Sequence, residues 1–176
     1  MNHKVEISTY AEETLTQNKT DILAIYEANG INIYPESKAH LISKKTGEVR
    51  QIDFPDIEYR ITDATDIDEN GDFWVINYFY PGDKRKLKLG NDSFITKFGI
   101  GRTHKNNKQV ERLIKLNFDG EKISLTDTPP VQLELKEGTD SNNWEGIVKL
   151  DDKGFLLIAD YYPYTRMVFV PYNFDK

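Results

Sequence analysis

The chain has 176 residues, of which 38% are hydrophobic and 12% aromatic, and its formal net charge is -6. These values exclude a disordered chain and predict a single domain over residues 1–176. The negative charge argues against a dedicated nucleic-acid binder, the apolar runs fall short of the roughly 20 residues of a membrane helix, and the absence of cysteine excludes disulfides.

Short alternating or apolar runs dominate the sequence, and almost no stretch has the apolar spacing of an amphipathic helix. This pattern predicts an all-β chain with one short helix at Tyr10–Gln17. Long loops are expected at Pro81–Gln109 and Glu137–Asn143, which are polar or rich in Lys, Gly and Asn. The predicted strands, each rich in Ile, Val, Leu, Phe or Tyr, are Val5–Thr9, Ile22–Glu27, Ile31–Tyr34, His40–Ser43, Val49–Phe54, Ala64–Asp68, Phe73–Phe79, Arg112–Asn117, Lys122–Leu125, Val131–Leu135, Gly146–Leu150, Phe155–Asp160 and Met167–Pro171.

An internal repeat relates Thr62–Pro81 to Trp144–Pro163. In both copies a turn containing Gly precedes an apolar strand, and that strand ends in aromatic residues followed by Tyr-Pro. Two more strands follow the first copy, and a similar pair precedes it. Four antiparallel strands repeated in this order predict blade-like sheets of a β-propeller.

A family resemblance rests on three segments of the second copy. Asn143–Val148, followed by Asp152–Asp160 and Phe169–Pro171, resembles the last blade of esterase-like and phytase-like β-propellers, and more loosely that of regucalcin-like propellers. Only two to three blades are predicted here, whereas a closed ring needs at least four. The chain is therefore expected to be a fragment, to complete a ring with other copies, or to pack its sheets in another way.

Carboxylates begin the first strand of each copy. Asp63 and Asp66 stand in one copy and Glu145 in the other, while Asn77 and Asp160 end the second strands. First strands line the channel of a propeller, so these acids would converge on one opening, where they can hold a metal or act as a general base. The alternative is that they hydrogen-bond to neighbouring blades. The resemblance implies that metal and substrate bind at this opening, with Glu145, Asp63 and Asp160 as the catalytic residues.

A second acidic segment matches the first half of a calcium-binding loop. Asp66, Asp68, Asn70 and Asp72 alternate around a Gly, as oxygen ligands do in such loops. The match ends there, because Asn77 stands where the loop needs a bidentate Glu. The sequence therefore leaves two interpretations, a calcium site with these four ligands or a hairpin turn with solvated acids.

Aromatic residues gather where the repeated strands end. Rings with a polar tip suit sugar or peptide ligands, and the alternative is packing between blades. The predicted ligand-binding residues are Trp144, Tyr78, Tyr161, Tyr162 and Asn77.

The leading functional prediction is a ligand-binding or protein-recognition module of propeller type. The expected partners are a small molecule, a glycan or a protein, with self-association as a further expectation, and neither a nucleic acid nor a membrane span is expected. The alternatives are a calcium-assisted phosphoester or ester hydrolase, as the resemblance implies, and a purely structural piece. An exported or periplasmic location is expected, although Met1–Tyr10 lacks the apolar stretch of a signal peptide.

Overall fold

The computed structural model describes residues 10–136, 141–161 and 163–174. Its strands form three antiparallel sheets, which confirms the all-β class, and none of these sheets closes into a barrel. The first sheet consists of β1 (Glu12–Gln17), β2 (Asp21–Tyr26), β3 (Lys38–Ser43) and β4 (Val49–Asp53). The second sheet consists of β5 (Arg60–Ala64), β6 (Asp72–Phe79), β7 (Val110–Phe118), β8 (Ile123–Leu125) and β9 (Val131–Gln132), which also pairs with β7. The third sheet consists of β10 (Trp144–Leu150), β11 (Gly154–Tyr161) and β12 (Tyr164–Pro171).

The sheets contain four, five and three strands, so the predicted four strands per sheet hold only for the first. Within each sheet, β1 to β4, β5 to β8 and β10 to β12 follow the chain from one neighbour to the next. The repeat identified in the sequence corresponds to β5 and β6 in its first copy and to β10 and β11 in its second.

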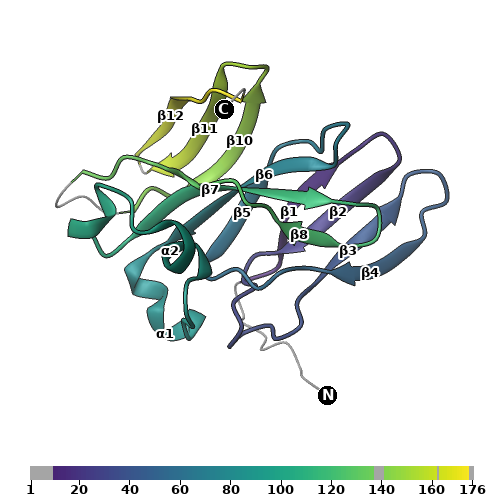
Figure 1. Ribbon diagram of the computed structural model, residues 1–176, viewed down its shortest axis with the longest axis horizontal. Helices are drawn as coiled ribbons and strands as arrows, with labels where there is room; N and C mark the ends of the chain where they lie inside the picture. Colours follow the sequence, from purple (N-terminus) through teal and green to yellow (C-terminus); the bar gives the residue numbers. More distant parts are fainter. Residues whose placement is uncertain (1–9, 137–140, 162, 175–176) are drawn as a thin grey trace.

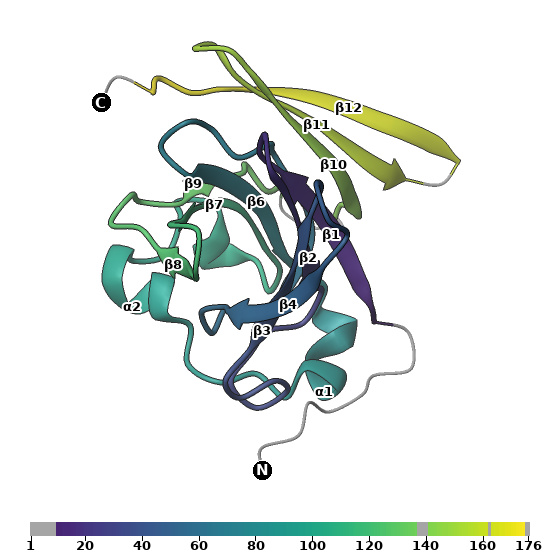
Figure 2. The same ribbon diagram turned by 90° about the vertical axis from the view of Figure 1, so that its right-hand side faces the viewer.

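The second sheet lies between the other two (Figures 1 and 2). Successive side chains of a strand point to opposite faces of its sheet, and β6 is apolar on both faces. Phe73 and Val75 contribute to the core shared with the first sheet, whereas Trp74 and Ile76 contribute to the core shared with the third. The run of apolar residues in β6 therefore reflects burial on two sides.

The first strands of the three sheets hold one another by hydrogen bonds from short side chains. Thr14 and Thr16 of β1 donate to the carbonyl oxygens of Ile61 and Thr65, at 3.1 and 2.7 Å. In the same way Thr62 of β5 donates to the carbonyl oxygen of Trp144, at 2.6 Å. These hydroxyls let the strands approach closely where larger side chains would separate them, so β5 lies against both β1 and β10.

Short helices occupy the long segment between β6 and β7. They are η1 (Pro81–Asp83), α1 (Lys84–Leu87), α2 (Ser93–Phe98) and η2 (His104–Asn106). Across the residues that the structure describes, the helices are too short and too polar to cross a bilayer.

Two predicted elements are wrong. The expected helix at Tyr10–Gln17 is strand β1, in which Thr14 and Thr16 are buried and Glu13, Leu15 and Gln17 are exposed. The expected strand at Ile31–Tyr34 is a turn, because the amides of Ile33 and Tyr34 both donate to the carbonyl oxygen of Gly30.

Other predicted strands are displaced or shortened. The strand expected at Ala64–Asp68 begins earlier, at Arg60, and ends at Ala64. The strand expected at Val131–Leu135 is reduced to Val131–Gln132. The strand expected at Val5–Thr9 lies outside the described residues.

Arg112 of β7 is a buried cation that ties α2 to the second sheet. Its side chain is 1% exposed and donates to both carboxylate oxygens of Asp92, at 2.9 and 3.1 Å, and to Asn77, at 2.8 Å. Asp92 in turn accepts from the amides of Phe94 and Ile95, which caps the start of α2. A single carboxylate thus neutralises the buried guanidinium and caps the first turn of the helix.

Replacement of Asp92 by Ala should lower the free energy of unfolding by about 3–5 kcal/mol, because Arg112 would remain buried without a counter-charge. Urea denaturation measures this difference. The control is Glu69→Ala, which removes an exposed partner of Lys19 and should change the free energy by less than about 1 kcal/mol. Equal effects of the two substitutions would contradict the role given to the Arg112–Asp92 pair.

Candidate functional site

Five polar side chains meet where the first strands of the sheets begin. In an antiparallel sheet the end of the second strand lies beside the start of the first, so residues of both strands reach the same place. Glu27 follows β2, Arg60 begins β5 and Tyr78 lies near the end of β6. Asn143 precedes β10, and Glu145 is its second residue. We call these five residues the junction.

A continuous chain of hydrogen bonds joins the junction across all three sheets. Arg60 donates to the Glu27 carboxylate and to the Tyr78 hydroxyl. Tyr78 donates to the side-chain oxygen of Asn143, whose amide nitrogen donates to Glu145. The guanidinium also lies over the Tyr78 ring, 4.8 Å from its centroid. The junction is therefore a polar connection between sheets that otherwise meet through apolar cores.

Burial determines the protonation behaviour of the junction. It raises the pKa of the Glu27 carboxyl to about 7, against the opposing effect of the Arg60 guanidinium. Burial also raises the pKa of Glu145, and the charge of Arg60 again opposes the rise. Two carboxyl groups, Glu27 and Glu145, thus share the single cation Arg60, and their oxygens can accept hydrogen bonds from a ligand.

One oxygen of Glu27 has no hydrogen-bond partner among the described residues, although the whole residue is 0% exposed. A small hollow of about 210 Å³ opens at the same end of the strands, lined by Arg60, Tyr78, Tyr80, Ser141 and Asn143. Buried polar groups are normally paired, so an unpaired one calls for an explanation such as strain, a catalytic role or a bound partner. The junction thus combines an unsatisfied acceptor with a nearby hollow.

Of the predicted ligand-binding residues whose side chains the structure describes, Tyr78 alone lines this hollow. Trp144 is 4% exposed, and its indole nitrogen donates to Glu111 at 2.6 Å. Asn77 points toward the first sheet, where it accepts from Arg112 and donates to the carbonyl oxygen of Glu58. The backbone of Tyr161 pairs with Tyr164, and Tyr162 lies outside the described residues.

The three predicted catalytic carboxylates have different surroundings. Glu145 belongs to the junction. Asp63 accepts from the amide of Ile147 at 2.8 Å, which is the backbone role that the sequence left as the alternative. Asp160 is exposed, and its charge contributes to the raised pKa of Glu145.

The predicted calcium segment forms the turn between β5 and β6. Asp68 accepts from the amides of Asn70 and Asp72, at 2.9 and 3.0 Å. The carboxylate of Asp72 pairs with Lys115 at 2.6 Å, and Asp66 is exposed. Within residues 10–136, 141–161 and 163–174, no three Asp, Glu or His side chains gather in a group that could hold a metal. The hairpin interpretation accounts for each contact, and calcium binding stays a prediction.

Glu27 and Arg60 are site residues that the sequence analysis missed. Glu27 was only the last residue of the predicted strand Ile22–Glu27, and Arg60 lay outside every predicted strand, so neither charge was given a role. Their pairing depends on the packing of the first sheet against the second, which periodicity does not reveal. Asn143 was quoted in the segment that carries the resemblance, without a role.

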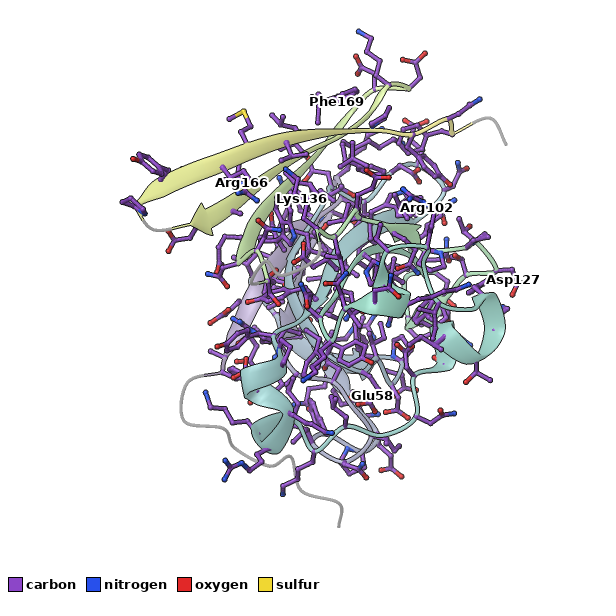
Figure 3. All side chains as sticks on the ribbon, turned by 90° about the vertical axis from the view of Figure 1, so that its left-hand side faces the viewer. Glu58, Arg102, Asp127, Lys136, Arg166 and Phe169 are labelled. Atoms are coloured by element: carbon purple, nitrogen blue, oxygen red, sulfur yellow. The ribbon has the colours of Figure 1, made fainter. Side chains whose placement is uncertain are left out.

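A larger groove lies between β9 and β12, where the third sheet diverges from the second. Its volume is about 640 Å³, and its lining includes Leu133, Trp144, Leu157, Val168 and Arg166. Figure 3 shows Arg166 and Lys136 beneath β12 and Phe169 above it, and all three residues contribute to the lining of the groove. Arg166 donates to the side-chain oxygen of Asn142 at 2.6 Å.

A scan against models of protein families, a search of curated proteins and a search of solved structures each found no match to the chain.

The pH dependence of stability tests the environment of Glu27. Because burial raises its pKa in the folded protein, Glu27 stabilises the fold below its ordinary pKa of 4.5, and this contribution is lost as the pH rises through about 7. In the Glu27→Gln variant this titration is absent. Relative to the wild type, the variant should therefore gain about 3 kcal/mol of unfolding free energy between about pH 4 and pH 8.

Urea denaturation at a series of pH values measures this gain. Glu69→Gln is the control, because that carboxylate is exposed, and its difference from the wild type should not change over the same range. A constant difference between Glu27→Gln and the wild type would contradict the raised pKa.

Proposed function

We propose that the chain is a ligand-binding module built from propeller-type sheets. Three features support the propeller-type arrangement: each sheet is a meander, the sheets pack face to face in series, and their first strands lie side by side. Radially repeated sheets have this order, with first strands nearest the common axis. The junction then lies at one opening of the channel that runs along this axis. Propeller-type folds commonly bind their ligands at such an opening.

The observation that carries the ligand proposal is the exposed ring of Tyr80 at the hollow beside the junction. Tyr80 is 47% exposed and lines the hollow together with Arg60, Tyr78, Ser141 and Asn143. A flat ring offers apolar area to one face of a sugar, while hydroxyl, amide and carboxylate groups hydrogen-bond its rim. The ligand class that this set fits best is a short glycan.

A calcium-assisted hydrolase does not fit the residues of the opening. Glu145 lies beside Arg60 and Asn143, and Asp63 is used by the backbone of β10. No third carboxylate joins them in the described part of the chain as a metal group. No catalytic step through a metal follows from this arrangement.

A glycan array with immobilised cellulose, chitin and xylan oligosaccharides tests the proposal. The wild-type chain should bind at least one class, and Tyr80→Ala should weaken that binding by about tenfold, or about 1.4 kcal/mol, because the stacking surface is lost. Tyr164→Ala is the matched control, since this Tyr is 75% exposed, begins β12 and does not line the hollow. No binding by the wild type, or equal binding by the Tyr80→Ala variant, would contradict the proposal.

A further inference from the structure

The outer face of the third sheet, which points away from the second sheet, is apolar and open. The register of β10, β11 and β12 places its side chains in two rows across the strands. The rows are Gly146–Ile158–Met167 and Val148–Leu156–Phe169. Met167 is 62% exposed, Val148 55% and Phe169 49%. Contiguous exposed apolar surface of this kind marks an interaction site.

The internal repeat indicates that this face can pack against another sheet, because the equivalent face of the first copy does so. Ile76 of β6 occupies the same place in its copy as Ile158 of β11 does in the second, and Trp74 corresponds to Leu156. The third sheet covers Trp74 and Ile76, which are 3% and 0% exposed. Among the described residues no sheet covers Ile158, which is 38% exposed. The outer face of the third sheet therefore repeats a surface that elsewhere in the chain packs against another sheet.

The first sheet offers a complementary face at the opposite end of the series. Its inner face packs on the second sheet, and its outer face carries two rows, Leu15–Ala24–His40 and Ile22–Ile42–Val49. Leu15 is 60% exposed and Val49 58%. None of the four rows contains Lys, Arg, Asp or Glu. The next row of the first sheet's outer face holds Lys38 and Asp53, which pair with each other, so a contact centred on the four rows buries no unpaired charge.

We propose that a second copy of this chain covers the third sheet with the outer face of its own first sheet. This contact continues the face-to-face packing that already joins the first sheet to the second and the second to the third. Made reciprocally about a two-fold axis, it buries both open faces of both copies. The pair then contains six sheets, a number within the range of about four to eight over which radially repeated sheets close.

Light scattering on the full chain during size-exclusion chromatography tests the proposal. The wild type should have twice the mass of one chain at micromolar concentration. Ile158→Glu should weaken the pair at least tenfold, because it places a charge in the contact. Ile100→Glu is the matched control, since Ile100 is 48% exposed in the segment between α2 and η2, outside both faces, and its variant should remain paired. Circular dichroism confirms that each variant is folded.

Leu15→Lys separates this contact from one in which two third sheets face each other. It should weaken the pair at least tenfold, as Ile158→Glu does, and an equimolar mixture of the two variants should pair more tightly than either alone, because one contact is then intact and the other joins Lys to Glu. A monomeric wild type, a larger ring or filament, or pairing that survives Leu15→Lys would each overturn the proposal. These outcomes are independent of glycan binding.

Discussion

A strand that lies between two cores must be apolar on both faces, and the architecture depends on β6 meeting this requirement. Phe73 and Val75 bind the second sheet to the first, and Trp74 and Ile76 bind it to the third. The polar residues at the end of the strand divide in the same alternation. Asn77 turns toward Arg112 on one side, and Tyr78 turns toward the junction on the other. One strand thus positions the buried ion pair at α2 and the candidate site.

The polarity of the junction follows from how closely the first strands approach. Threonine hydroxyls between β1, β5 and β10 replace bulky apolar contacts, so the starts of the strands converge. Where the strands converge, Glu27, Glu145 and Arg60 are partly or fully removed from solvent. This burial raises the pKa values of the two carboxyl groups. Farther from this line the third sheet diverges from the second, and the groove beneath β12 opens there. The same packing of the sheets therefore produces both the close polar contacts of the junction and the open groove between β9 and β12.

The sequence predicted most strands because alternation along a strand is a local property. It was wrong at β1, where Ala11, Glu12 and Glu13 are residues that helices tolerate, because pairing with β2 overrides that local preference. It was wrong again at Ile33, which is fully buried although it lies in a turn. At the candidate site, Glu145 and Tyr78 were found through the repeat. Glu27 and Arg60 were missed, since nothing in the sequence around either residue indicates that the two side chains meet.

The sequence by itself determined the all-β class, the order of the strands and the repeat, because side-chain alternation and glycine turns act over a few residues. Only the tertiary structure decided which carboxylates meet a cation, which acids cap turns and which apolar faces have no cover. These outcomes depend on contacts between residues far apart in the chain, such as Glu27 with Arg60 and Asp63 with Ile147. Such contacts exist only after the sheets have packed, and no local pattern specifies them.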